Sequence, residues 1–127
     1  MTRPAFLLDS NMCIYALSGR SPDLRDRLEA CRVGELVTSS IVYAEVMRGI
    51  APDNRADNDR AAQFFRAVPV QPFDEQAALR FRDVPFRRAQ FDRLIAAHSL
   101  ALGLVLVTNN VSDFADIRHL KVEDWTR

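Results

Sequence analysis

Three carboxylates that lie far apart in the sequence are the side chains best suited to do chemistry. Asp9 follows the apolar run of residues 5–8, Glu45 lies inside a segment of helical period, and Asp92 comes at the start of another such segment. Mg²⁺ and similar hard cations bind oxygen ligands, and a Mg²⁺ site usually combines one or two carboxylates with several waters. A cation held by these acids would activate a water to attack a phosphodiester bond. Asp9, Glu45 and Asp92 are therefore candidate ligands for metal-dependent hydrolysis.

Each of the three acids also has a purely structural explanation. An Asp at the end of a strand can cap the helix that follows, so Asp9 alone does not indicate a site. Glu45 can pair with Arg48, three residues further along the same helix. Negative charge in the first turn of a helix, where Asp92 lies, is stabilised by the helix dipole. Spacing alone therefore leaves the metal site and the structural explanations open.

The acids can meet only if the chain brings the ends of several strands together. Short apolar runs predict strands at residues 5–8, 35–38 and 104–107, with a last one at 120–125. Residues 68–73 contain two prolines, which cannot donate to a β-ladder, and this segment is predicted to be at most an edge strand. Strands of continuous apolar character that alternate with helices indicate a parallel sheet with helices on both faces.

The helices between these strands are marked by capping residues at their starts and glycines at their ends. Helices are predicted at residues 12–17, 22–33, 41–50, 61–67, 75–84 and 91–102, with a helical turn at 111–116. Ser10 or Asn11 is expected to cap the first helix, and Ser39 or Ser40 the third. The polar residues 52–59 are predicted to form a loop or the frayed start of a helix.

The carboxyl ends of the predicted strands are the place to look for a site, because parallel sheets bind ligands in the crevice outside those ends. Asp9 ends the first strand, while Thr108 and Asn110 follow the strand at 104–107, with Asp113 three residues later. Asn110 offers a carbonyl oxygen and Asp113 a carboxylate, so either can complete a metal site.

The composition is that of an ordinary globular protein. The 127 residues suit a single domain that spans residues 1–127. Because Lys+Arg and Asp+Glu both number 17, no net charge draws the chain to nucleic acid, and any contact with RNA must be local. Arg87, Arg88 and Arg93 lie close to Asp92 in sequence and are candidate contacts to RNA phosphates, with a solvated helix face as the alternative.

The cysteines and the apolar runs indicate where the protein works. Cys13 and Cys31 form no metal-ligand or CxxC spacing, so we expect buried free thiols and a reducing compartment. The apolar run near the N-terminus is too short for a signal peptide, and no run is long enough to span a membrane. A cytoplasmic protein is predicted. His98 and Trp125 are interpreted as core residues.

Three parts of the sequence resemble the motifs of PIN-domain ribonucleases, and most of all the VapC toxins of bacterial toxin–antitoxin pairs. They are FLLDSNMCIY at residues 6–15, TSSIVYAEVMRG at 38–49, and FDRLIAAH at 91–98 with LVLVTNNVSDF at 104–114. The resemblance implies a three-layer α/β/α fold with a central, mainly parallel sheet, a Mg²⁺ or Mn²⁺ cofactor and endonucleolytic cleavage of RNA. It also implies a cognate VapB-type antitoxin and a homodimer.

The same resemblance assigns roles to individual residues. Asp9 and Asp92 match the main metal-binding aspartates of the family, and Glu45 matches its third acid. Many relatives carry a fourth acid where this chain has Asn110, so Asp113 is the candidate for that catalytic role, or the site runs with three carboxylates. Four further residues are expected to support the acids. They are Ser10, Asn11, Thr108 and Asn110.

The function that these observations favour is a Mg²⁺-dependent endoribonuclease, the toxin of a type II toxin–antitoxin system, which hydrolyses RNA through a metal-activated water. The alternative is a regulatory module that acts through a protein partner, either a catalytically silent PIN domain or a receiver-like Mg²⁺-binding domain. A receiver-like domain needs a lysine after a late strand, and Lys121 is the only lysine in the chain.

Overall fold

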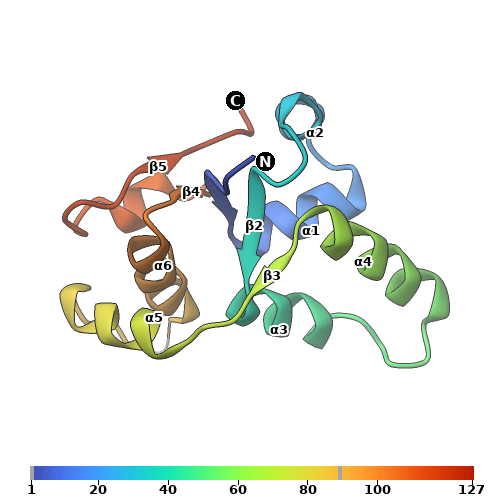
Figure 1. Ribbon diagram of the computed structural model, residues 1–127. Coiled ribbons are helices and arrows are strands. Elements are labelled where there is room, and N and C mark those ends of the chain that lie inside the picture. The colour runs from blue at the N-terminus through green and yellow to red at the C-terminus, as the bar shows by residue number, and fades with distance from the viewer. Residues whose placement is uncertain (1, 89) are drawn as a thin grey trace.

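A sheet of five parallel strands forms the centre of the molecule (Figure 1). The structure is a computed structural model that describes residues 2–88 and 90–127. The strands are β1 (Phe6–Leu8), β2 (Leu36–Ser39), β3 (Val70–Gln71), β4 (Val105–Val107) and β5 (Val122–Glu123), in the order β3-β2-β1-β4-β5. All four strand pairs are parallel. The predicted parallel sheet is confirmed, and β3, the segment with two prolines, does lie at an edge.

Helices cover both faces of the sheet. They are α1 (Ser10–Ser18), α2 (Pro22–Ala30), α3 (Ser40–Arg48), α4 (Arg55–Ala67), α5 (Glu75–Arg80) and α6 (Phe91–Leu102), with the 3₁₀ helices η1 (Phe81–Asp83) and η2 (Val111–Phe114). Figure 1 shows α1, α2 and α4 on one side of the sheet and α5 and α6 on the other. The three-layer α/β/α architecture is therefore confirmed.

Most helix boundaries follow from local capping chemistry. The Ser39 hydroxyl accepts a hydrogen bond from Ile41 N–H at the start of α3, and Gly103 ends α6 in the left-handed conformation, with φ of 70°. The prediction for residues 52–59 was too conservative, because Asn54 caps α4 by accepting from the Asp57 N–H. That cap allows a regular helix to begin at Arg55, although the segment is polar.

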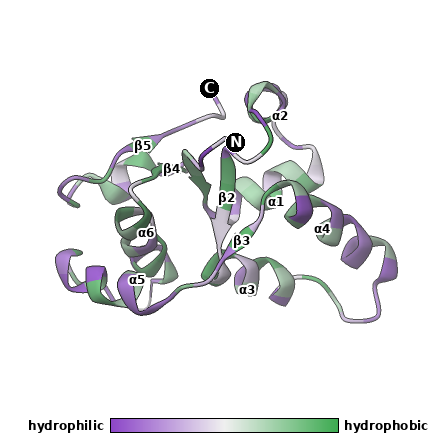
Figure 2. Cartoon of the chain, in the orientation of Figure 1, coloured by the Kyte–Doolittle hydropathy of each residue, from purple (hydrophilic) through white to green (hydrophobic). Residues whose placement is uncertain are grey.

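The core lies between the sheet and the two helix layers. Leu7, Leu8 and Leu106 on the central strands are fully buried, and Trp125 packs edge-on against Phe6 with 4.8 Å between ring centroids. Figure 2 shows hydrophobic residues along the central strands and mostly hydrophilic ones on α4. No described helix is both long enough and apolar enough to cross a membrane.

Both cysteines are free thiols, as predicted. Cys13 is fully buried against the sheet, whereas Cys31 is only half-buried, so the expectation of a buried thiol is correct for Cys13 alone. Trp125 and His98, each 1% exposed, are core residues as interpreted from the sequence.

Candidate active site

The acids predicted from the sequence are positioned at the carboxyl edge of the sheet. Asp9 follows β1 directly, and its backbone N–H donates to the Val107 carbonyl at the end of β4 at 3.1 Å. On the other side of β1, the Thr38 hydroxyl donates to the Leu8 carbonyl at 2.7 Å. The last residue of β1 and the residue after it are thus held by both neighbouring strands, and Asp9 starts from a rigid backbone.

Asp9 is both the cap of α1 and a buried carboxylate. Its Oδ1 accepts a hydrogen bond from the Met12 N–H at 3.0 Å, so Asp9, not Ser10 or Asn11, caps the helix. The expectation of a Ser10 or Asn11 cap was wrong because α1 begins at Ser10, directly after the strand. The cap fixes the Asp9 side chain at the mouth of the sheet, where it is only 4% exposed.

The pKa of Asp9 indicates which charges surround it. Burial raises this pKa to about 6, while hydrogen bonding from the Thr108 side chain and the Met12 N–H acts in the opposite direction. The carboxylates of Asp92 and Glu45 raise it further. The charges of Asp92 and Glu45 therefore act on Asp9, although the three acids are far apart in sequence.

Glu45 projects from α3 and is held by α1. The Ser10 hydroxyl donates to its Oε1 at 2.5 Å, and the side chain is half-buried. Within residues 2–88 and 90–127, Glu45 makes no ion pair with Arg48, so the structural explanation offered for Glu45 is wrong.

Asp92 lies in the first turn of α6, within electrostatic range of Asp113 in the 3₁₀ helix η2. Its pKa is raised, first by burial and then by the charge of Asp113, whereas Arg93 acts in the opposite direction. The Asp113 N–H donates to the Asn110 carbonyl at 3.0 Å, which closes the turn that carries the Asp113 side chain.

The polar residues after β4 organise this turn. Thr108 is fully buried and its hydroxyl accepts from the Asn110 N–H at 3.1 Å. Asn11 donates to the Asn109 side chain at 3.4 Å, which joins the start of α1 to the same turn. Asn110 itself is exposed. Of the two candidates for a fourth acidic position, Asp113 is the one whose charge acts on Asp92.

None of these four acids has a cationic partner among the described residues. Nor are any three Asp, Glu, His or Cys side chains of that part of the chain gathered closely enough to form a ready-made metal site. Repulsion between the carboxylates opposes a closer grouping, and a bound cation would offset that repulsion. The carboxylates Asp9, Glu45 and Asp92 are hard oxygen donors, and Asp9 is buried without a compensating charge. The donor set therefore fits Mg²⁺ or Mn²⁺.

The arginines near Asp92 differ from the expectation. Arg93 is 1% exposed and its guanidinium is bonded to Asp116, so the prediction that Arg93 contacts RNA is corrected. Arg87 pairs with Asp116 at 3.4 Å but remains partly exposed, and Arg88 is exposed. Of these three arginines, Arg87 and Arg88 are the two whose side chains are exposed to solvent.

Two interactions were missed from the sequence. Asp116 binds Arg93 across 23 positions, and the Ser39 hydroxyl lies 2.8 Å from His98 Nδ1 across 59 positions. The second contact joins the start of α3 to the middle of α6, and burial lowers the pKa of His98. No local pattern indicates either pair, because each joins separate elements.

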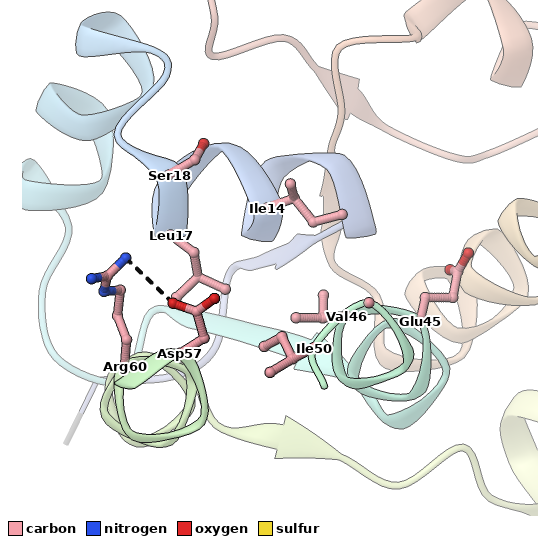
Figure 3. Close-up of a pocket in the computed structure, with 9 residues that line it drawn as sticks. Ile14, Leu17, Ser18, Glu45, Val46, Ile50, Asp57 and Arg60 are labelled. Carbon is pink, nitrogen blue, oxygen red and sulfur yellow. Dashed lines mark ion pairs between the residues drawn. The ribbon is translucent and has the colours of Figure 1, made fainter. Parts of the chain in front are cut away.

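An apolar groove leads away from Glu45 between α1, α3 and α4 (Figure 3). Its volume is about 270 Å³, and Ile14, Leu17, Val46 and Ile50 line it together with Glu45. Figure 3 shows the Asp57–Arg60 ion pair at the end of the groove that lies away from Glu45.

Comparison with known proteins shows that residues 6–120 match the PIN domain family. The chain therefore belongs to the PIN domain family, among its VapC-type ribonuclease toxins. It is 28% identical to the tRNA(fMet)-specific endonuclease VapC of Shigella flexneri, over 95% of this chain and 98% of that protein. It is 31% identical to Ribonuclease VapC1 of Haemophilus influenzae (strain R2866), over 96% and 98%. The crystal structure of DNA-bound VapBC from Salmonella typhimurium superposes with a TM-score of 0.84 at 27% identity, over 96% of this chain and 98% of that one.

Proposed function

We propose that this VapC-type chain is an active endoribonuclease that depends on Mg²⁺, or on Mn²⁺, and that it acts as the toxin of a type II toxin–antitoxin system in the cytoplasm. The observation that carries the proposal is Asp9, a carboxylate that is 4% exposed and lacks a cationic partner among the described residues. Its pKa is raised mainly by burial, and further by Asp92 and Glu45. Burying such a group is costly unless a cation compensates it.

The proposed ligands are Asp9, Glu45 and Asp92, with Asp113 as the fourth acid. When bound, the cation supplies Lewis acidity for the attack of water on the phosphodiester and offsets charge on the leaving oxygen. The cap on α1 orients Asp9, and Ser10 orients Glu45 through its hydrogen bond.

Other residues of the chain support and extend this site. Thr108 stabilises the ionised form of Asp9, because its side chain lowers the pKa of that acid. Asn11 and Asn110 fix the turn between β4 and η2 through the bonds described above. Arg87 and Arg88, which precede α6, are proposed to bind the phosphates of the RNA.

The partners follow from the relatives. A toxin of the VapC type is paired with a VapB-type antitoxin, and we propose such a partner here, together with a homodimer of the toxin. The groove beside Glu45 is apolar and open, which suits a protein segment placed next to the acids. We further propose that residues 1–127 act as one domain.

The receiver-like alternative has little support. Lys121 immediately precedes β5, so it lies at the amino end of a parallel strand. The acids lie at the carboxyl edge of the same sheet, and a lysine at the opposite edge does not reach them.

The test is RNA cleavage by the purified chain with Mg²⁺ or Mn²⁺, using transfer RNA as the first substrate because the Shigella flexneri relative is named for one. We expect cleavage that EDTA abolishes and that Asp9→Asn weakens. Asp74→Asn is the matched control, since Asp74 also caps a helix through Oδ1, at 3.0 Å from the Ala77 nitrogen, but is exposed. Equal cleavage by wild type and Asp9→Asn would contradict the proposal.

A further inference from the structure

Arg93 is a buried cation directly beside a proposed metal ligand. It follows Asp92 in α6 and its side chain is 1% exposed. Its guanidinium donates to both carboxylate oxygens of Asp116, from Nη1 at 3.2 Å and from Nη2 at 3.1 Å. A buried guanidinium is tolerated only when its charge and its donors are matched, and this bidentate pair provides the match.

The same guanidinium also binds two backbone carbonyls. Nη2 donates to the Asp113 carbonyl at 2.9 Å, and Nη1 lies 3.5 Å from the Pro85 carbonyl. One side chain thus joins the start of α6, the 3₁₀ helix η2 and the loop before α6. Asp116 extends the connection by pairing with Arg87 at 3.4 Å.

Asp113, whose carbonyl accepts a hydrogen bond from Arg93, is also an acid whose charge acts on Asp92. After burial, Asp113 is the largest contribution to the raised pKa of Asp92. The bond from Arg93 fixes the Asp113 backbone, and the bond between the Asp113 N–H and the Asn110 carbonyl fixes it from the other side. With its N–H and its carbonyl both hydrogen-bonded, the Asp113 backbone is held in place against the side chain that follows Asp92.

We propose that Arg93 is a positioning residue that holds η2 against α6, so that Asp113 completes the set of acids as a ligand of the metal ion. This inference rests on the proposed function, because it requires a metal site at Asp9 and Asp92. Groups that orient metal ligands typically contribute about 10–100-fold to metal affinity. Arg93 acts through Asp113 and contacts neither the metal nor the RNA.

Electrostatics and positioning predict opposite changes in metal affinity when Arg93 is replaced. Removing a cation close to a metal site should strengthen metal binding by electrostatics, since like charges repel. Losing the position of Asp113 should weaken it. We therefore expect Arg93→Met to bind Mn²⁺ about tenfold more weakly than wild type by calorimetry. Arg93→Lys, which keeps the charge but lacks the planar fork, should also bind more weakly. Arg80→Met, which breaks the exposed Arg80–Asp83 pair, is the control and should bind as wild type does.

A double-mutant cycle decides whether Arg93 acts through Asp113. Asp113→Asn should weaken Mn²⁺ binding, and adding Arg93→Met to it should cause no further loss. Circular dichroism identifies variants that do not fold, and Arg93→Lys carries the test if Arg93→Met is one of them. Unchanged or tighter Mn²⁺ binding by the folded Arg93 variants would overturn the proposal. So would an Arg93→Met substitution that lowers Mn²⁺ affinity by the same factor in the wild type and in Asp113→Asn. If the wild-type chain binds no Mn²⁺ at all, the proposed function fails first, and that result is distinct from a failure of Arg93 alone.

Discussion

Two neighbouring clusters of charged side chains differ in whether a cation of the chain compensates their carboxylates. The acidic cluster comprises Asp9, Glu45, Asp92 and Asp113. The ion-pair cluster comprises Arg87, Arg93 and Asp116. Asp116 faces two guanidiniums, and hydrogen bonding to Arg93 lowers its pKa. The acidic cluster has no cation bound to it within the described chain, and the pKa of Asp9 rises to about 6.

The ion-pair cluster is compensated within the described part of the chain, whereas the acidic cluster is not. Asp92 and Arg93 are consecutive residues, yet Arg93 is fully paired while Asp92 faces another acid. A fold that needed only stability would compensate both clusters in the same way, because an uncompensated buried charge is costly. This difference supports the proposal that a cation from outside the chain completes the acidic cluster. Each of the following changes tests this difference.

The largest effect is expected for Asp92→Asn. It removes a proposed metal ligand and leaves the ion-pair cluster intact, so RNA cleavage should fall at least about 100-fold while the fold persists. Initial rates of cleavage with Mg²⁺ measure the loss. Asp83→Asn, which removes an acid from the exposed pair with Arg80, should keep its activity. Comparable losses in both variants would mean that charge, and not the acidic cluster, matters for cleavage.

Replacing an acid by its amide should change the free energy of unfolding in opposite directions in the two clusters. The pKa of Asp9 is raised from its ordinary value of 3.8 to about 6, so the folded protein loses stability as the pH rises through this range, and the loss is complete above it. Asp9→Asn keeps an oxygen to cap α1 and should stabilise the metal-free protein by about 1–3 kcal/mol near pH 7.5. The gain should fade as the pH falls toward about 4, where the wild-type carboxyl is protonated in the folded state. Urea unfolding at several pH values measures the difference.

Asp116→Asn provides the opposing arm of that experiment. It leaves the buried guanidinium of Arg93 without its carboxylate, so unfolding should become easier. The pKa of Asp116 is held low, and its contribution should therefore persist at neutral pH and disappear only as Asp116 is protonated in acid. Destabilisation by both Asp9→Asn and Asp116→Asn would remove the distinction between the clusters.

Metal binding should compete with protons at Asp9. With a pKa of about 6, the carboxyl is almost fully ionised near pH 7.5 and only about one quarter ionised near pH 5.5. The affinity for Mn²⁺ should therefore fall by at least about fourfold between these values, since metal ligation needs the ionised form. Titrations followed by the melting temperature measure this, and Asp9→Asn should show no rise at either pH. A wild-type affinity independent of pH would exclude Asp9 as a ligand.

The sequence predicted the framework better than the contacts within it. The bounds of α6 and the edge position of β3 follow from local features, namely apolar periodicity and the prolines before Phe73. The cap of α1 was predicted at Ser10 or Asn11, whereas Asp9 forms it, because an Asp at a strand end can also cap the helix that follows. The clusters themselves depend on long-range packing: Ser10 meets Glu45 across 35 positions, and Arg93 meets Asp116 across 23. Sequence spacing contains no information about such pairs until the sheet order is known.

The smallest effect is expected for Ser10→Ala, which tests how Glu45 belongs to the acidic cluster. The Ser10 hydroxyl is the hydrogen-bond donor that the structure gives to Glu45, and a single hydrogen bond to a charged group contributes only about 1.5–3 kcal/mol at most. Part of that contribution returns when water replaces the hydroxyl at this half-buried side chain. We therefore expect Ser10→Ala to weaken Mn²⁺ binding only about threefold, and Glu45→Gln to weaken it more, because the amide loses the negative charge itself. If the two variants lose affinity equally, Ser10 does more than orient Glu45. If Ser10→Ala binds Mn²⁺ more tightly, the bond holds Glu45 away from the other acids, and Asp113 then contributes more to the site than Glu45 does.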